Sequence, residues 1–264
     1  MILIRNRFFA AFALFLAITA ARPACSADLE DLVVVFLHGK GAWAGAFDGG
    51  LVNILHREGA MVAAPELPWS FGRIYDATYQ DAMREIDDVV SKLKTQGRRT
   101  QVVLIGHSLG ANAAIGYAAS HGPLAAVIAL APSHLPEIEE MQRLSHDARV
   151  EAARLVAAGQ GDVPHAFPDA IQSIPTSVMA TPFVYLSMFD PDGPAVIRKN
   201  AAAMPAVPVL WVSGRFDWGA DLGRDYASAL VAKNPKSRYV EVPAGHLTVG
   251  WMARTMILDW LKSL

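Results

Sequence analysis

Short apolar runs alternate along the chain with longer segments in which apolar residues recur at helical spacing. Runs that are apolar at nearly every position suit strands buried on both faces, as in parallel sheets. Each run stops at a glycine or proline within two residues. The six predicted strands are Leu32–Leu37, Met61–Ala64, Gln101–Ile105, Leu124–Leu130, Val207–Val212 and Arg238–Val242.

Four helical segments lie between or after these runs: Asp76–Lys94, Ser108–Ser120, Leu222–Ala232 and Leu247–Leu261. Strands that alternate with helices indicate βαβ units, in which parallel strands are joined by helices that cover the sheet. We therefore expect an α/β protein with a mostly parallel, doubly wound sheet of about six strands.

One segment interrupts this alternation between the fourth and fifth runs. Pro136–Ala158 has the apolar stripe of an amphipathic helix, and the residues after it mix aromatic side chains with prolines. Because so long a stretch without a buried strand is atypical of the sheet itself, we predict that residues 133–205 form a helical cap or lid. The alternative is a small helical domain with no role in binding substrate.

The first 27 residues differ from the rest of the chain. Arg5 and Arg7 precede the apolar run Phe8–Ala21, and small residues follow at Cys25-Ser26-Ala27. This order is typical of a secretory signal peptide, and the run is shorter than the roughly 20 residues that span a bilayer. We expect cleavage near Ala27, a mature domain at 28–264 without a membrane span, and a secreted or periplasmic location. A retained N-terminal anchor is the alternative.

Composition and charge exclude several classes of protein. The chain is 53% hydrophobic and 18% charged, which is incompatible with a disordered or collagen-like chain. A net charge of −2 provides no basic surface for nucleic acid, and one cysteine cannot form a cysteine-based zinc site. The histidines form no H-E-x-x-H pattern, so we expect neither a metal nor a cofactor.

The sequence Gly106-His107-Ser108-Leu109-Gly110 matches G-x-S-x-G between a predicted strand and a predicted helix. That context is typical of a nucleophile elbow, a strained turn that exposes the serine hydroxyl. Both glycines are needed because a side chain at either position would collide with a neighbouring strand or helix. Ser108 is the candidate nucleophile.

A serine nucleophile needs a base and an acid that orients the base. His246 follows the sixth strand and is the candidate base, whereas Asp217 follows the fifth strand and is the candidate acid. Asp221 and Asp225 are alternatives, but they fall where a helix is predicted to begin.

Two backbone N–H groups are candidates for binding an oxyanion. One belongs to Leu109, at the start of the helix after the serine, and the other to Lys40 in His38-Gly39-Lys40-Gly41. Gly41 is the alternative second donor, and we expect the Lys40 ammonium to point to solvent. Trp43 and Trp69 follow strand ends and are candidate substrate-binding residues.

Together these motifs resemble the serine-nucleophile, esterase- and lipase-like branch of the α/β-hydrolase superfamily, from about Leu32 to Leu261. The resemblance implies a sheet that starts at the superfamily's third core strand and a cap inserted after its sixth. It also implies hydrolysis of a small-molecule substrate through an acyl-enzyme. Esters, amides and thioesters share this machinery, and we favour carboxylic esters for an exported enzyme.

Two other functions compete with this interpretation. Gly39–Ala44 fits the dinucleotide pattern G-x-G-x-x-A, which would suit an NAD-dependent oxidoreductase. Trp43 is bulky for a pyrophosphate turn, and no clean ribose-binding acid follows. A catalytically inactive hydrolase fold used for binding is the other alternative.

Overall fold

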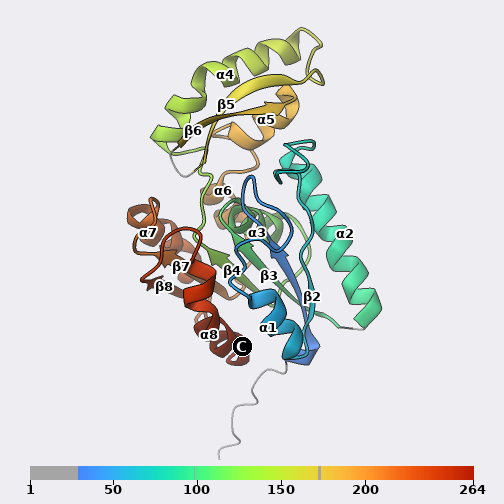
Figure 1. Cartoon of the computed structure of the whole chain (residues 1–264), viewed down its shortest axis with the longest axis vertical. Helices are drawn as coiled ribbons and strands as arrows, with labels where there is room; N and C mark the ends of the chain where they lie inside the picture. The colour runs from blue at the N-terminus through green and yellow to red at the C-terminus, as the bar shows by residue number, and fades with distance from the viewer. Residues whose placement is uncertain (1–28, 98, 172–173) are drawn as a thin grey trace, which may run out of the picture.

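The computed structural model describes residues 29–97, 99–171 and 174–264, and its centre is a six-stranded parallel sheet. The strand order is β2-β1-β3-β4-β7-β8, which confirms the predicted doubly wound α/β fold (Figure 1). The strands are β1 (Leu32–Leu37), β2 (Met61–Ala63), β3 (Gln101–His107), β4 (Ala126–Leu130), β7 (Val209–Gly214) and β8 (Arg238–Val242).

Alternate residues of each central strand enter cores on opposite faces of the sheet. In β1, Val33 and Val35 face one core, whereas Val34 and Phe36 face the other. The first core is covered by α2 (Tyr79–Gly97), α3 (Leu109–Ser120) and α7 (Ala220–Val231), and the second by α1 (Leu51–Arg57) and α8 (Val249–Lys262). Burial on both faces explains why these strands are continuously apolar in sequence.

Residues 133–205, called the insertion below, lie between β4 and β7 and sit above one end of the sheet (Figure 1). They contain α4 (Glu139–Ala157), β5 (His165–Ile171), β6 (Ile174–Ala180), α5 (Pro182–Phe189) and α6 (Ile197–Ala203). The prediction of a helical insertion was therefore incomplete, because β5 and β6 pair as an antiparallel two-stranded sheet. Pro168 and Pro175 are tolerated there because each strand of such a sheet has a free edge.

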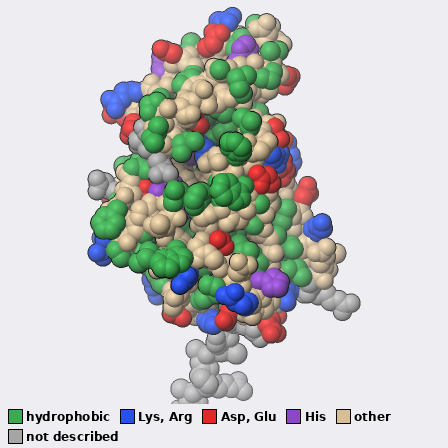
Figure 2. Space-filling model, viewed as in Figure 1, with side chains coloured by type: hydrophobic (Ala, Val, Ile, Leu, Met, Phe, Trp, Pro, Cys, Tyr) green, Lys and Arg blue, Asp and Glu red, His purple; other side chains and the backbone are tan. Residues whose placement is uncertain are grey.

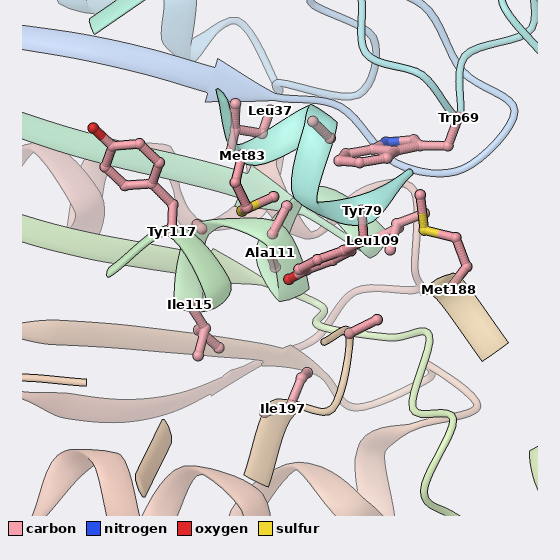
Figure 3. Packing of buried hydrophobic residues seen from close by; sticks show 14 of the residues in the cluster. Leu37, Trp69, Tyr79, Met83, Leu109, Ala111, Ile115, Tyr117, Met188 and Ile197 are labelled. Atoms are coloured by element: carbon pink, nitrogen blue, oxygen red, sulfur yellow. The ribbon is translucent and has the colours of Figure 1, made fainter. Parts of the chain in front are cut away.

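The insertion packs into the same core as the sheet. Met188 of α5 and Ile197 of α6 lie in one hydrophobic cluster with Leu109 and Ile115 of α3 (Figure 3). The buried Asn112 side chain of α3 also donates to the carbonyl oxygens of His134 and Ala195, at 2.7 and 2.8 Å. The start of the insertion and the segment just before α6 are thereby hydrogen-bonded to the helix that follows Ser108.

The predicted signal peptide, Met1–Ala27, lies outside the described residues. Within residues 29–97, 99–171 and 174–264, no helix has the length and apolar character needed to cross a bilayer.

Candidate active site

Ser108 occupies a strained turn between β3 and α3. Its φ of 58° and ψ of −120° lie in a region that side chains rarely adopt, and its N–H donates to the Leu130 carbonyl at 2.9 Å. A Cβ on Gly106 would lie 2.1 Å from the Gly110 carbonyl oxygen, and one on Gly110 would lie 2.1 Å from that of Leu37. Glycine at both positions therefore permits the turn that presents the Ser108 hydroxyl.

In the structure, the candidate nucleophile, base and acid form one continuous chain of hydrogen bonds. His246 Nε2 lies 3.0 Å from Ser108 Oγ, and His246 Nδ1 lies 2.9 Å from Asp217 Oδ2. Because a carboxylate only accepts, Nδ1 carries the proton and Nε2 presents its lone pair to the hydroxyl. Of the three acids considered from the sequence, it is Asp217 that bonds the imidazole.

A second hydroxyl, which the sequence interpretation missed, lies beside Ser108. Ser133 Oγ is buried and lies 2.7 Å from Ser108 Oγ. Since the Ser108 hydrogen is directed to His246, the Ser133 hydroxyl donates to Ser108 Oγ. The available sequence signal was its position just beyond the fourth apolar run, at the same edge of the sheet as Ser108.

Two neutral histidines form hydrogen bonds with backbone groups near Ser108 and His246. His107 Nε2 donates to the His246 carbonyl at 2.8 Å, and burial beside His246 lowers the pKa of His107 to about 4. His38 donates from Nδ1 to the Gly39 carbonyl and accepts the Leu67 N–H on Nε2, and burial lowers the pKa of His38. Both rings are therefore uncharged at neutral pH.

The loop after β1 passes directly against Ser108. A Cβ on Gly39 would lie 2.9 Å from Ser108 Cβ. The Gly41 N–H donates to the Trp69 carbonyl at 2.8 Å, so this alternative oxyanion donor is already engaged. The N–H groups of Lys40 and Leu109 bond no residue in the described part of the chain.

Residues 34–254 match the Alpha/beta hydrolase family. The chain belongs to this family. Among solved structures, the hydrolase is similar to a monoacylglycerol lipase of Paleococcus ferrophilus, with 21% identity and a TM-score of 0.63 over 88% of this chain and 94% of the lipase. It is also similar to an esterase of Pyrococcus furiosus, with 16% identity and a TM-score of 0.58 over 88% and 81% of the two chains.

A thioesterase domain from the curacin biosynthetic pathway has the same fold, with 17% identity and a TM-score of 0.53 over 88% of the hydrolase and 92% of the domain. No curated protein matches the sequence. At these identities the solved structures show the fold of the hydrolase and leave its substrate open.

A cavity of about 90 Å³ reaches the Ser108 and His246 side chains of the hydrolase. The insertion contributes much of its apolar wall, through Met141 and Leu144 of α4 and Ile171 of β5. Hydrophobic side chains also gather on the surface just below the insertion (Figure 2). The remaining lining residues are Lys40, Ala42, Phe47, His107, Ser133, His134, Ile138, Glu140, Ala170, Trp218 and Leu247.

Trp43 and Trp69, the predicted substrate-binding residues, do not line this cavity. Trp69 is fully buried in the core, where its indole N–H donates to the His38 carbonyl at 2.9 Å. Trp43 is 61% exposed and packs against Phe47 at a centroid distance of 6.1 Å. An aromatic residue at a strand end can thus pack in the core or lie on the surface. Residues of the insertion, instead of Trp43 and Trp69, form part of the cavity wall.

The Lys40 side chain also differs from its prediction. Its ammonium does not point to solvent but lies 2.5 Å from Asp169 Oδ1 and 3.0 Å from the Ala170 carbonyl oxygen, both in β5. The Lys40 side chain is 9% exposed and that of Asp169 is 3% exposed. This ion pair was not predicted, because its two members are 129 residues apart in the chain.

The competing dinucleotide pattern lacks its physical basis here. A pyrophosphate-binding turn opens directly into a helix, whose N-terminus receives the phosphates. Gly39–Ala44 leads into turns, and α1 begins only at Leu51. Within the described residues, no group of three or more His, Cys, Asp or Glu side chains could hold a metal ion.

Proposed function

We propose that the hydrolase cleaves carboxylic esters through a Ser108–His246–Asp217 triad. The observation that carries this proposal is the continuous chain of hydrogen bonds from Asp217 to Ser108, which ends at an apolar cavity. A serine hydroxyl is a weak nucleophile by itself, and a neighbouring imidazole oriented by a carboxylate is what activates it.

In the proposed reaction, Ser108 Oγ attacks the carbonyl carbon while His246 Nε2 takes the hydroxyl proton. Asp217 holds the imidazole and stabilises its charged form. The N–H groups of Lys40 and Leu109 bind the developing oxyanion, where the loss of one donor typically costs about 10²–10³ in kcat. His246 then protonates the leaving alcohol, and water attacks the acyl-enzyme with His246 as base to regenerate Ser108.

The size of the cavity favours a small acyl group. Its volume of about 90 Å³ is below the roughly 150 Å³ of an engineered protein cavity that holds benzene. We propose that the insertion acts as a cap, because α4 and β5 supply the wall that an acyl chain would contact. Acetyl and butyryl esters should therefore be better substrates than octanoyl esters.

The test is a panel of p-nitrophenyl esters of increasing acyl length, with a p-nitroanilide for amide cleavage and an acyl thioester beside them. We expect ester cleavage to be fastest and Ser108→Ala to lower kcat by about 10⁴-fold or more while the protein remains folded. Undiminished turnover by Ser108→Ala in a clean preparation would exclude Ser108 as the nucleophile. Faster cleavage of the anilide or of the thioester would reject the proposed ester specificity and indicate an amidase or a thioesterase.

We also propose that the hydrolase is exported. The support is the sequence of Met1–Ala27, with its arginines, short apolar run and small residues. Mass spectrometry of the protein from an expressing bacterial culture should find a mature N-terminus near Asp28 in the periplasm or medium. An intact Met1 terminus in the membrane fraction would instead indicate a retained anchor.

A further inference from the structure

A buried ion pair joins the loop after β1 to the insertion. Lys40 Nζ contacts Asp169 Oδ1 and the Ala170 carbonyl oxygen, and Asp169 Oδ1 also accepts the Ala170 N–H at 2.7 Å. Lys40 is thereby attached to both the backbone and a side chain of β5. The same strand places Ala170 and Ile171 at the cavity wall, and a Cβ on Gly41 would lie 3.5 Å from Ile171 Cδ1.

Aromatic side chains surround this pair, among them the Tyr75 phenol and the His134 imidazole. The Lys40 ammonium lies 5.4 Å from the centroid of the Phe189 ring. On the other side, the charge of Asp169 adds to burial in raising the pKa of the Tyr75 phenol. Moving two charges out of water is costly, and a buried ion pair is often no more stabilising than well-packed apolar residues of similar volume. Apolar residues could fill the same space, so stability alone does not account for the pair.

The position of Lys40 in the chain suggests what the pair does. The Lys40 backbone N–H is the proposed second oxyanion donor, and the preceding residue, Gly39, packs against Ser108. The contacts of the Lys40 side chain therefore influence the position of the backbone N–H that would bind the oxyanion. If β5 moved away, Lys40 would lose both of its partners at once.

We propose that Lys40 and Asp169 form a latch that places the Lys40 N–H for oxyanion binding only while β5 is seated over the cavity. This inference rests on the proposed ester hydrolysis. Both residues are positioning residues, because their side chains act through the Lys40 backbone and the cavity wall. Closure of the insertion and completion of the oxyanion site are then one event.

Substitutions of the side chains test the latch without removing the backbone donor. Lys40→Met keeps the backbone N–H and an unbranched side chain that is only one atom shorter, and Asp169→Asn keeps the shape of the carboxylate. Each should lower kcat for p-nitrophenyl acetate by about 10- to 100-fold, the range of a weakened oxyanion donor, with KM changed less than threefold. The double variant should lose no more than either single variant. Lys40→Arg, which can still pair with Asp169, should recover most of kcat.

Lys262→Met is the matched control, because Lys262 forms an ion pair with Glu58 at 2.7 Å on the exposed surface. Its kcat should remain within twofold of wild type. Hydrogen exchange of the amides of His165–Ile171 gives a second measurement that needs no activity. Exchange there should be faster in Lys40→Met and Asp169→Asn than in wild type or Lys262→Met.

Folded Lys40→Met and Asp169→Asn variants with wild-type kcat would overturn the latch. A fall in kcat without faster exchange in β5 would also overturn it, because the loop would then act independently of the insertion. If wild type cleaves no ester, the proposed function fails, and exchange alone then decides whether the pair holds β5 in place. Unchanged exchange in that case rejects the latch.

Discussion

At the scale of single residues, the contact between two hydroxyl groups has the most direct consequence for activity. Ser133 donates to Ser108 Oγ, the atom that attacks in the proposed mechanism. We predict that Ser133→Ala lowers kcat/KM for a short ester by about 10-fold, the equivalent of one hydrogen bond of about 1.4 kcal/mol. Initial rates per folded molecule measure this effect.

A buried serine far from Ser108 provides the control. Ser237 Oγ accepts the Val209 N–H at 2.9 Å, at the opposite end of β7 from Asp217. Ser237→Ala should lower stability and leave kcat/KM within twofold of wild type. Equal activity losses in the two variants would mean that the effect of Ser133→Ala arises from general destabilisation.

The chain order of Ser108, Asp217 and His246 could be predicted because each follows a recognisable strand, and parallel strands bring their carboxyl ends to one edge of the sheet. Ser133 could not be assigned, since its contact depends on the path of the chain after β4. The orientation of the Lys40 side chain could not be predicted either. Its ammonium binds Asp169, which lies in a strand that was not predicted from the sequence.

At the scale of elements, the strand–turn–helix around Ser108 depends on close contact between backbones. A methyl group at Gly106 would lie 2.1 Å from the Gly110 carbonyl oxygen, so α3 could not keep its distance from β3. We predict that Gly106→Ala lowers the free energy of unfolding by about 3 kcal/mol or more. Urea denaturation measures the change.

Gly122→Ala is the matched control, because a Cβ there meets nothing within 4 Å. It should alter the free energy of unfolding by less than about 0.5 kcal/mol. If Gly106→Ala changed the free energy of unfolding as little as Gly122→Ala, α3 and β3 could not approach as closely as described.

Helix α4 should set the acyl length that the cavity accepts. Met141 lines the cavity, and truncating it to alanine removes part of the wall. We predict that Met141→Ala raises the ratio of kcat/KM for octanoyl over butyryl ester by about 10-fold, since one methylene in an apolar pocket is worth roughly 1–3 kcal/mol. Val150→Ala, at a 60% exposed position of the same helix, should leave the ratio unchanged. Equal ratios in the two variants would remove α4 from the acyl site.

The hairpin of β5 and β6 shows where prediction from the sequence stopped. Buried positions in β5 include both Phe167 and Asp169, so a charged residue interrupts the apolar alternation that identifies a strand. Pro168 and Pro175 also argue against strands at these positions, unless the strands are known to have a free edge. The four inner strands of the central sheet, β1, β3, β4 and β7, carried no such conflict, because nearly all of their side chains are buried by helices on both faces.

At the scale of the whole molecule, buried neutral histidines make stability depend on pH. Burial lowers the pKa of His107 and of His134 to about 4, whereas an unfolded histidine titrates near 6.5. The unfolded chain therefore binds more protons between these values, so stability is full above about pH 6.5 and falls toward pH 4. Each histidine contributes at most about 3 kcal/mol to this change.

We predict that His134→Gln flattens the fall in the free energy of unfolding between pH 6.5 and 4.5, measured by urea denaturation at several pH values. His146→Gln, at an exposed position of α4, is the control and should retain the wild-type slope. An unchanged slope in His134→Gln would show that His134 is not held neutral in the folded protein.

A fluorophosphonate probe shows whether the folded hydrolase activates Ser108, because only an activated serine reacts quickly with it. Peptide mass spectrometry should find the phosphonate on Ser108 within minutes for wild type. Ser108→Ala and His246→Ala should remain unlabelled under the same conditions. An intact wild-type protein with no label, or with label on another residue and Ser108 free, would show that Ser108 is not activated and would favour a binding protein that uses the hydrolase fold.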